Sequence, residues 1–519
     1  MNRAKQKGGA VPRPPEREQV AAGRVRIVGE KPTDTVSTAR DSLPHGWASA
    51  TIGDICDLNP RLPDAPKPST EISFVPMAAV SEHTGTIVSP QTRKFREVSK
   101  GYTQFRDGDV IWAKITPCME NGKAAVAHNL INGIACGSTE FFVLRSTGAV
   151  LPEFIYKFIR QVSYRNAAAR SMSGAVGQAR VTKNFLNSTP FALPPLAEQR
   201  RIVARLKKLA ARSRRARAAL DAVPQMLAQA RQSLLAAAFR GELTKDWREK
   251  NKNLESGTSI VKILEAAHDD AGGHKRGNAA QATEGVHNLT PADFPKTWGL
   301  TDLLNLCSPG KPVTYGILMP GPDQPNGVPY VRVADYPGEV INLKTVRRTT
   351  KEIESNFARA RLNTGDLLLS IRGTVGRMAI VPPELHGANI TQDTVRLSIT
   401  DEVETAFVEY ILRAPATLTR MQKATKGVAV RGINVGDIRA LQIPIPPLPE
   451  QREIVSRLKR AFARLDAAAA AHAAAVAELD RLDESLLARA FTGQLVPQNP
   501  KDEPAAKLLD RLRVQTLKL

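Results

Sequence analysis

Cysteine is scarce in this chain, with four residues among 519. Such a number in so long a chain does not indicate a disulfide framework. Long apolar runs are missing too. No stretch of about 18 apolar residues, the length needed to span a membrane, occurs in the chain. The N-terminus lacks the apolar core of a signal peptide. We therefore expect a cytoplasmic protein without a membrane segment.

Signatures of catalysis and of metal binding are also missing. The segment Ser308-Pro-Gly-Lys311 lacks the spacing and the hydroxyl group of a phosphate-binding loop. No G-x-S-x-G, H-E-x-x-H or paired C-x-x-C motif occurs, and the eight histidines are scattered. There is no Gly-rich turn of the kind that binds a dinucleotide or adenosyl cofactor, and no Asn-Pro-Pro-aromatic tetrapeptide of the amino-methyltransferases. We expect no catalytic residue, no metal site and no cofactor in this chain.

Positive charge, by contrast, is in excess. The chain has 73 Lys and Arg against 51 Asp and Glu, a formal net charge of +22. This excess is typical of proteins that bind nucleic acid. A generally basic protein with no such role is the alternative that charge alone leaves open.

A ladder of apolar or small residues at heptad spacing occurs twice. Ile202 and Ile454, 252 positions apart, begin the two copies. The first ladder consists of Ile202, Leu206, Leu209, Ser213, Ala216, Leu220, Val223, Leu227, Ala230 and Leu234. The second consists of Ile454, Leu458, Ala461, Leu465, Ala468, His472, Ala475, Leu479, Leu482 and Leu486. The spacing predicts two long helices with coiled-coil seams, in which Ser213 and His472 are the polar interruptions. We expect the seams to pack on each other within one chain; packing on a second chain is the alternative.

The duplication extends beyond the helices. Leu193-Pro-Pro-Leu196 with Glu198-Gln-Arg200 matches Ile445-Pro-Pro-Leu448 with Glu450-Gln-Arg452, and Phe239-Arg-Gly-Glu-Leu243 matches Phe491-Thr-Gly-Gln-Leu495. Upstream, Gly108-Asp109 pairs with Gly365-Asp366, Gly122-Lys123 with Gly376-Arg377, and Trp47–Cys56 with Trp298–Cys307. The chain is therefore interpreted as two copies of one unit. Cys56 and Cys307, at matched positions, are expected to be small buried residues rather than nucleophiles.

The predicted fold is α+β, with two β-rich globules that are each followed by a long helix, and the two helices form an antiparallel coiled coil. Short β-rich runs bounded by Gly, Pro and Asp mark the globules, and helical stretches are expected at 152–170 and 404–423. Pro224 should kink or split the first long helix. The expected segments are a disordered basic tail (1–42), a globule (43–192), a helix segment (193–248), a loose linker (249–293), a second globule (294–444), a second helix segment (445–497) and a C-terminal tail with one or two helical turns (498–519).

A globule followed by a helix that begins with Pro-Pro-Leu-x-Glu-Gln-Arg occurs twice in the chain. This arrangement resembles that of the specificity subunit of type I restriction-modification systems. The resemblance covers about residues 43 to 497, and Gly365-Asp-Leu-Leu-Leu-Ser-Ile-Arg-Gly-Thr-Val-Gly376 is similar to part of that family's target-recognition domain. The first globule departs from this pattern, since its segment from Gly108 to Gly122 is three residues longer.

The resemblance implies that each globule reads one half of a bipartite DNA site through base edges in the major groove. It implies that the helices set the spacer between the half-sites; a helix over 198–239 would be roughly 63 Å long at 1.5 Å per residue. The implied partners are double-stranded DNA, two modification (methyltransferase) subunits and restriction (translocase/endonuclease) subunits. S-adenosylmethionine, ATP and Mg are expected on those partners. The alternatives are a self-sufficient DNA-modifying enzyme with an unrecognised active site, and a helical scaffold that never touches DNA.

Candidate DNA contacts are basic and polar residues of the β-rich globules. The matched Lys123 and Arg377 are joined as candidates for phosphate or guanine contact by Lys114, Arg332, Arg372 and Arg431, and Gln178, Arg180 and Thr374 are weaker candidates. An ordinary solvated side chain is the alternative for each.

Both long helices begin with a concentration of positive charge. The cations are Arg200, Arg201, Arg205, Lys207, Lys208, Arg212, Arg214, Arg215 and Arg217 in the first helix, and Arg452, Arg457, Lys459, Arg460 and Arg464 in the second. They could flank DNA between the globules, dock acidic partner subunits, or form an exposed charged face that stabilises the seam.

Overall fold

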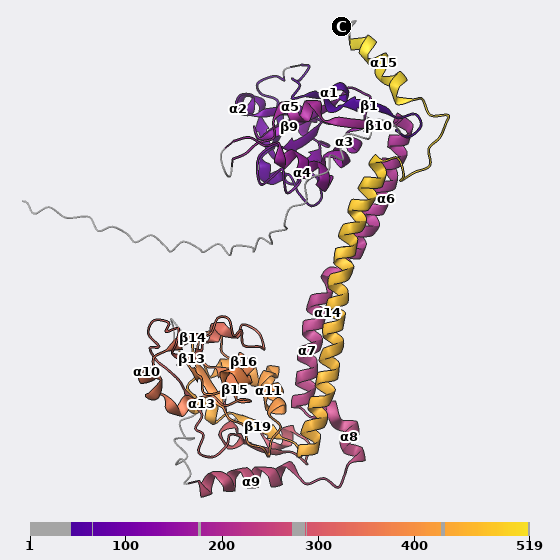
Figure 1. The fold of residues 1–519 in the computed structure, drawn as a ribbon. Coiled ribbons are helices and arrows are strands. Elements are labelled where there is room, and N and C mark those ends of the chain that lie inside the picture. Colours follow the sequence, from indigo (N-terminus) through magenta and orange to yellow (C-terminus); the bar gives the residue numbers. More distant parts are fainter. Residues whose placement is uncertain are drawn as a thin grey trace, which may run out of the picture. The chain divides into compact units, whose positions relative to one another are not determined.

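The computed structural model describes residues 43–64, 66–174, 178–271, 286, 288–426 and 431–516. It divides into two compact units, shown in Figure 1: unit 1 comprises Met1–Lys208 with Glu484–Leu519, and unit 2 comprises Leu209–Asp483. The tail expected to be disordered, residues 1–42, lies outside the described residues. Each unit contains one globule together with parts of both long helices, so neither is a continuous piece of chain.

Unit 1 is built around two four-stranded sheets, of order β2-β9-β6-β7 and β4-β3-β8-β5, and a two-stranded pair β1-β10. Its strands are β1 (Ala48–Thr51), β2 (Cys56–Leu58), β3 (Glu71–Val75), β4 (Gln91–Lys94), β5 (Thr103–Arg106), β6 (Val110–Ala113), β7 (Ala124–Val126), β8 (Ile134–Gly137), β9 (Phe141–Ser146) and β10 (Pro190–Leu193). Its helices are α1 (Ile52–Ile55), α2 (Phe95–Val98), α3 (Pro152–Ile159), α4 (Val162–Arg170), α5 (Lys183–Ser188) and α15 (Ala505–Thr516).

Unit 2 repeats this plan with sheets of order β12-β18-β15-β16 and β14-β13-β17 and the pair β11-β19. Its strands are β11 (Gly299–Asp302), β12 (Thr314–Tyr315), β13 (Val328–Val331), β14 (Arg347–Thr349), β15 (Leu367–Ser370), β16 (Met378–Ile380), β17 (Asn389–Ile390), β18 (Thr394–Leu397) and β19 (Gln442–Ile445). Its helices are α7 (Val223–Phe239), α8 (Lys245–Lys250), α9 (Gly257–Asp270), α10 (Lys351–Ser355), α11 (Thr405–Arg413), α12 (Pro415–Lys423) and α13 (Val435–Arg439). Helices α6 (Leu196–Asp221) and α14 (Leu448–Phe491) contribute residues to both units.

The central strands of both units are buried along their whole length. All four residues of β6 and all four of β15 are inaccessible to solvent, with the indole of Trp112 in the middle of β6. Strands covered on both faces are expected to be continuously apolar rather than alternating. The runs Val110-Ile-Trp-Ala and Leu367-Leu-Leu-Ser have this pattern, which is why each ends up as the core strand of its unit.

The first long helix is divided as Pro224 predicts. Helix α6 ends at Asp221 and α7 starts at Val223, so that proline lies in the first turn of α7. Proline lacks the N–H that the interior of a helix requires, but a first turn does not need it.

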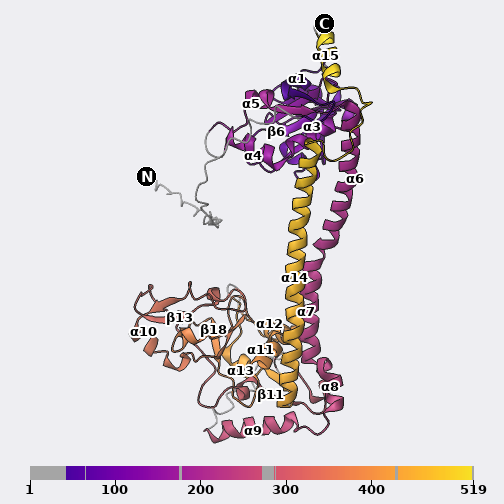
Figure 2. The same ribbon diagram turned by 45° about the vertical axis from the view of Figure 1, so that its right-hand side comes forward.

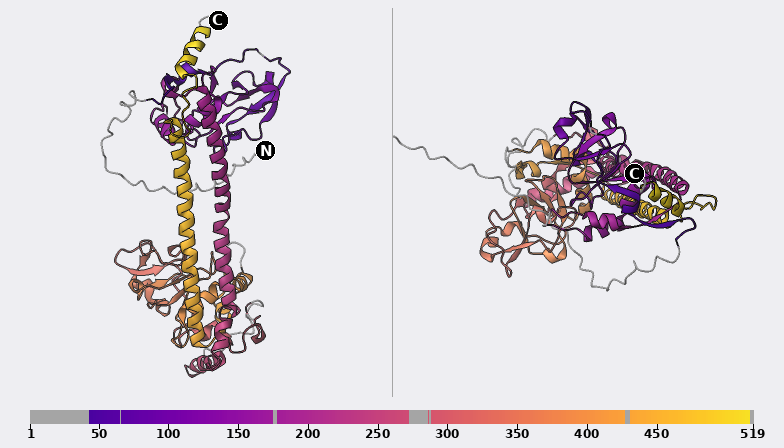
Figure 3. Two further views of the ribbon diagram at one scale, coloured as in Figure 1. Left: turned by 90° about the vertical axis from the view of Figure 1, so that its right-hand side faces the viewer. Right: turned by 90° about the horizontal axis from the view of Figure 1, so that it is seen from above.

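Within unit 2 the two helical segments pair in antiparallel fashion, and Figures 2 and 3 show α7 and α14 side by side. The register is fixed by polar contacts that run in opposite chain directions. Arg217 binds Asp480 at 2.8 Å, His472 Nε2 hydrogen-bonds the Leu220 carbonyl at 3.0 Å, and Arg231 binds Asp466 at 2.6 Å. The predicted antiparallel coiled coil is confirmed, and the polar seam residue His472 has an identified partner.

Two expected seam positions, Ala468 and Leu482, are exposed, and Leu482 is the larger departure. Leu482 is 47% exposed, whereas its neighbour Asp483 faces the opposite helix and accepts a hydrogen bond from the Ser213 hydroxyl at 3.1 Å. Arg217 also reaches Asp483, at 3.0 Å. A polar cluster therefore replaces the apolar contact that heptad counting placed at Leu482.

Two other segments are more ordered than expected. The segment 249–293 was expected to be a loose linker, but α9 lies within it and buries Ile260, Val261 and Leu264 against the body of unit 2. Residues 272–285 and 287 lie outside the described part of the chain. The C-terminal tail forms the twelve-residue helix α15, longer than one or two turns, and Leu509 on α15 belongs to the core of unit 1.

The Glu-Gln-Arg motif joins each globule to its helix in the same way in both copies. In unit 1 the indole Nε1 of Trp47 donates to Glu198 Oε2 at 3.1 Å, and Gln199 accepts from the Leu151 N–H at 2.8 Å. In unit 2, Trp298 donates to Glu450 Oε2 at 3.1 Å, and Gln451 accepts from the Glu404 N–H at 2.9 Å. Both copies therefore use the buried Glu to hold the first strand of the globule and the Gln to cap a globule helix.

The glycine that follows each long helix is required by conformation and by space. Gly241 and Gly493 have φ of +74° and +73°. A Cβ on Gly241 would lie 2.7 Å from Pro295 Cγ, and one on Gly493 would lie 2.6 Å from Pro44 Cγ. Only glycine adopts this left-handed conformation freely and permits so close an approach.

The cysteines at matched positions are buried, as expected. Burial raises the pKa of the Cys56 thiol and raises that of Cys307 to about 12. Both are thiols at neutral pH, which does not suit a nucleophile.

Candidate nucleic-acid interface

Three segments that are distant in sequence meet at one edge of unit 1. The first is the loop from β6 to β7 (114–123), and the second is the segment 178–181 before α5. Ile115 and Arg180 pair in an antiparallel bridge, and the Val181 N–H donates to the Lys114 carbonyl at 2.9 Å. Backbone hydrogen bonds therefore hold the two segments together.

The third segment of unit 1 is the turn from β8 to β9, which contains Glu140. The Lys114 N–H donates to the Glu140 carbonyl at 2.9 Å, and the Arg180 guanidinium binds both carboxylate oxygens of Glu140 at 2.9 Å. This hydrogen-bonded ion pair lowers the pKa of Glu140. The Lys114 ammonium lies 5.5 Å from the centre of the Phe142 ring. The edge is thus cationic, with one guanidinium held by a carboxylate.

Unit 2 has the same arrangement, made by the loop from β15 to β16 and the segment before α13. Arg372 and Gly432 pair in an antiparallel bridge, and the Ile433 N–H donates to the Ile371 carbonyl at 2.9 Å. Arg372 therefore occupies the place of Ile115, and Gly432 that of Arg180. The cations occupy different positions on equivalent backbones.

The third segment is again a turn between strands, from β17 to β18. The Ile371 N–H donates to the Asp393 carbonyl at 2.8 Å, as Lys114 does to Glu140 in unit 1. Arg372 Nη1 donates to Gln392 Oε1 at 3.3 Å. In this turn a neutral amide, not a carboxylate, partners the arginine.

Lys123 and Arg377, matched by sequence, are also matched in space. The Ala113 N–H donates to the Lys123 carbonyl and the Ser370 N–H to the Arg377 carbonyl, both at 2.9 Å. Both side chains are half-buried, and the Lys123 ammonium lies 3.4 Å from the Met77 carbonyl oxygen. They therefore lie at the root of each loop rather than at its tip.

The other sequence candidates fall into two groups. Four are exposed on the loop edges: Gln178, Arg372, Thr374 and Arg431. Arg332 is different, since its guanidinium binds Asp335 at 2.7 Å and donates to the Thr345 carbonyl at 2.8 Å. These bonds give Arg332 a structural role in the turn after β13.

Sequence reasoning missed Glu140 and Gln392. Both lie in short turns and both hydrogen-bond an arginine that the sequence did select. The duplication contains a weak indication of these two turns. Ser138-Thr-Glu140 and Thr391-Gln-Asp393 occupy matching positions once the strands of the two copies are superimposed. It could not be used without knowing which strands pair.

The helices present a second cationic surface. Arg201 and Arg217 of α6 are bound by carboxylates within the chain, Arg201 by Asp502 at 2.6 Å. Arg457 of α14 likewise binds Asp246 at 2.6 Å. The exposed cations of these helix segments are Arg200, Arg205, Lys207, Lys208, Arg212, Arg214, Arg215, Arg452, Lys459, Arg460 and Arg464. Arg217 therefore links the two long helices, whereas Arg201 and Arg457 bind acidic residues outside the seam, Asp502 and Asp246 of α8.

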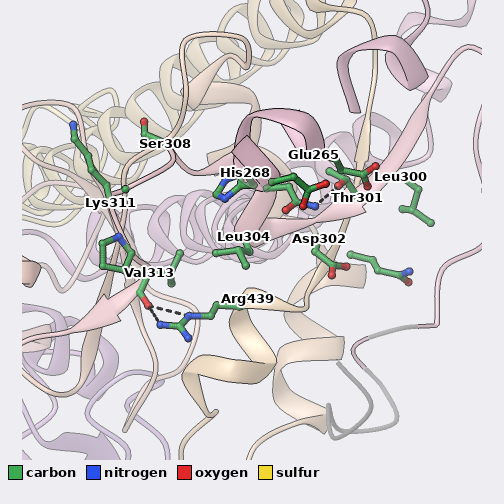
Figure 4. Close-up of a pocket in the computed structure, with 15 residues that line it drawn as sticks. Glu265, His268, Leu300, Thr301, Asp302, Leu304, Ser308, Lys311, Val313 and Arg439 are labelled. Carbon is green, nitrogen blue, oxygen red and sulfur yellow. Dashed lines mark hydrogen bonds between the residues drawn. The ribbon is translucent and has the colours of Figure 1, made fainter. Parts of the chain in front are cut away.

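A cavity of about 610 Å³ lies in unit 2 between α9 and β11 (Figure 4). Glu265 and His268 of α9 face Asp302, Lys311 and Arg439 across it. The Arg439 guanidinium donates two hydrogen bonds, at 2.6 and 3.1 Å, to the carbonyl of Val313, which also lines the cavity. None of the sequence candidates lines this cavity, so it is separate from the loop edge.

Across residues 43–516, apart from the gaps given above, no group of three or more His, Cys, Asp or Glu side chains is arranged to hold a metal ion. No helix in that part of the chain is long and apolar enough to cross a membrane.

Comparison with known proteins places the chain among restriction-modification proteins. The family described as "Type I restriction modification DNA specificity domain" matches residues 44–219 and 314–471, more than half of the chain. The chain is 29% identical over 361 residues to the specificity subunit of the type I restriction enzyme EcoBI from Escherichia coli, covering 67% of this chain and 69% of the relative. It is 26% identical over 472 residues to that of EcoEI from the same organism, covering 81% and 78%.

Two solved structures share the fold of this chain. The crystal structure of the HsdS subunit from Thermoanaerobacter tengcongensis superimposes with a TM-score of 0.59 at 25% identity, covering 88% of this chain and 99% of that one. A chain from a study of complex assembly and conformational transition of the type I R-M system superimposes with a TM-score of 0.60 at 24% identity, covering 88% and 100%.

Proposed function

The chain belongs to the type I restriction-modification DNA specificity family, and from this premise we propose that its two units read the two halves of one bipartite double-stranded DNA site. It is a specificity subunit, which binds DNA and assembles with other subunits, rather than an enzyme in its own right. The comparisons give no support to the alternative of a self-sufficient DNA-modifying enzyme.

The observation that carries the proposal is the repetition of one loop edge on two different sets of side chains. Lys114 and Arg180 in unit 1 stand on a backbone framework whose counterpart in unit 2 carries Ile371 and Gly432, while Arg372 replaces Ile115. A shared framework with divergent side chains suits two readers of different sequences. Lys123 and Arg377, the same charge at the same place, suit a phosphate contact that both half-sites share.

The helices are proposed to set the spacer between the half-sites. The polar contacts at Leu220–His472 and Arg217–Asp480 define one register for the antiparallel pair. Half-site spacing follows protein geometry in other DNA-binding proteins that read two half-sites. The spacer length would then be a property of the helix segments and not of the loops.

Two modification subunits and the restriction subunits are the proposed partners, with S-adenosylmethionine, ATP and Mg bound by them. The exposed cations of α6, such as Arg212, Arg214 and Arg215, are available either to DNA or to acidic surfaces of these subunits. Salt titration of complex assembly without DNA separates the two roles, because an ionic docking surface weakens as salt rises even when no DNA is present.

The experiment that tests the proposal is co-expression of the chain with its genomic neighbours, followed by sequencing of methylated adenines. A bipartite motif with a fixed gap is expected. Methylation or cleavage by the purified chain alone, given S-adenosylmethionine or Mg²⁺, would contradict it. Insertion of one heptad into each helix, where Leu220 faces His472, should lengthen the gap and leave both half-site sequences unchanged.

A further inference from the structure

We propose that Arg372 and Gln392 form a specificity-determining pair in unit 2 that reads the major-groove edge of a guanine. The proposal rests on the function proposed above and adds the class of base that this loop edge takes. It also assigns a role to Gln392, which no sequence pattern had singled out.

The backbone of both residues is held in place before any ligand binds. Arg372 is fixed by its bridge to Gly432, and the Gln392 N–H donates to the Ile317 carbonyl at 3.0 Å. The loop that carries Ile317 is itself pressed against β17, since a Cβ on Gly316 would lie 1.9 Å from the Ile390 carbonyl oxygen. A loop whose backbone is already ordered pays a smaller entropic cost on binding than a mobile loop does.

The surface around the pair has the character of an interface. Tyr315 ends β12, and Leu318 and Met319 lie in the loop that follows it beside Gln392; they are 43%, 47% and 83% exposed. Three large exposed side chains at this strand end and loop, which backbone hydrogen bonds hold in place, are suited to a binding partner. In a major groove they would meet base edges or thymine methyl groups.

The donors and acceptors that the two side chains leave free determine which base the pair can bind. A glutamine that is not bonded to an arginine can read adenine, because its amide offers an acceptor and a donor side by side. Here Arg372 Nη1 donates to the Gln392 oxygen, so the amide presents its NH₂ group and the guanidinium presents its remaining N–H groups. A surface of donors matches guanine, whose O6 and N7 are both acceptors, better than adenine or cytosine.

Unit 1 has an arginine–carboxylate pair at the equivalent edge, but on different backbone positions, since Arg180 corresponds to Gly432 and Glu140 to Asp393. Arg180 uses Nε and one Nη to bind Glu140, and that pairing occupies the fork that would bind guanine. Ile115 stands where unit 2 has Arg372, and Thr139 stands where it has Gln392. The pair is therefore specific to unit 2, and only one half-site should depend on it.

The test uses the complex assembled with its modification subunits and compares R372A, Q392A and Q392E with the exposed control R359A. Methylated motifs are mapped by sequencing, and binding is measured by competition with duplexes of single-base changes. In R372A and Q392A, one guanine position of one half-site should lose about tenfold or more in discrimination. The other half-site and the spacer should not change, and R359A should match the wild type.

Q392E is the sharper variant, because its carboxylate should hold Arg372 as Glu140 holds Arg180. We expect the guanine preference to fall as in R372A while thermal unfolding is unchanged. Replacement of that guanine by 7-deazaguanine, which lacks the N7 acceptor, should weaken the wild-type complex about tenfold and R372A little.

The outcomes separate the two proposals. A wild-type complex without any bipartite motif would overturn the proposed function. A wild-type motif that R372A, Q392A and 7-deazaguanine all leave unchanged would overturn only the guanine reading. Relaxation at an adenine or a cytosine instead of a guanine would overturn it as well.

Discussion

Glu198 accepts a hydrogen bond from Trp47, but its second carboxylate oxygen, Oε1, is buried without a hydrogen-bond partner in the part of the chain that the structure describes. The residue at the same place in the second copy, Glu450, has more hydrogen-bond donors around it. Thr244 donates to Glu450 at 2.7 Å, and the Arg248 guanidinium is bonded to it as well. Two copies of one motif therefore have different electrostatic surroundings.

We predict that W47F costs more stability than W298F. W47F removes the side-chain donor of a buried carboxylate, which should reduce the free energy of unfolding of unit 1 by about 1–3 kcal/mol. In W298F, Glu450 keeps Thr244 and Arg248, so the loss should be smaller. Hydrogen exchange resolved by segment reports the two units separately, and equal losses would contradict the prediction.

Val496 occupies the place in unit 1 that Thr244 has in unit 2, counted from the matched glycines. V496T should therefore supply Glu198 with the missing donor and raise the unfolding free energy by about 1 kcal/mol. The matched change T244V should lower it by a similar amount in unit 2. Denaturant unfolding checks both, and a V496T chain less stable than the wild type would refute the idea.

The pKa of Glu198 is raised, and burial is the main cause. A carboxyl with a raised folded-state pKa binds its proton more tightly in the native state, so its stabilising effect is complete at low pH. That effect is lost as pH rises from the ordinary value of 4.5 through the folded-state pKa. E198Q should therefore be more stable than the wild type above this window and should lose that part of the pH dependence. Thermal unfolding across pH 4 to 8 is the measurement, and identical pH profiles would count against the prediction.

The corrected seam predicts a difference between two leucines. Leu206 is buried in the core of unit 1, so L206D should cost about 3 kcal/mol or more by burying an unpaired charge. Leu482 is exposed, so L482D should change stability by less than about 0.5 kcal/mol. Thermal unfolding of both variants tests the register directly, and comparable losses would restore Leu482 to the seam.

Sequence periodicity predicted the fold because the apolar ladder and the proline break are local properties of the chain. It failed at Leu482, downstream of the Ala467–Ala471 run, because small side chains constrain the facing surface weakly and let a polar cluster at Asp483 replace an apolar contact. The helix α9 was missed because it is only 14 residues long and is flanked by polar segments.

The loop edge was predicted only in part for a different reason. Lys123 and Arg377 could be paired because a glycine precedes each in both copies. Glu140 and Gln392 acquire their partners from segments 40 and 20 residues away, through hydrogen bonds that no sequence spacing encodes. Likewise, the partner that Glu198 lacks can be noticed only beside the one that Glu450 has.

The discontinuous composition of unit 1 has a consequence for its biosynthesis. The ring of Phe491 lies 4.7 Å from that of Phe154, and Leu509 lies in the same core. Phe491 leaves the ribosome 337 residues after Phe154, and Leu509 later still. During translation the first globule must therefore wait, with part of its apolar surface open, until unit 2 and almost all of the second helix have been made. A chaperone that protects nascent chains would act on this face, and a chain truncated near its C-terminus would be damaged at its N-terminal end.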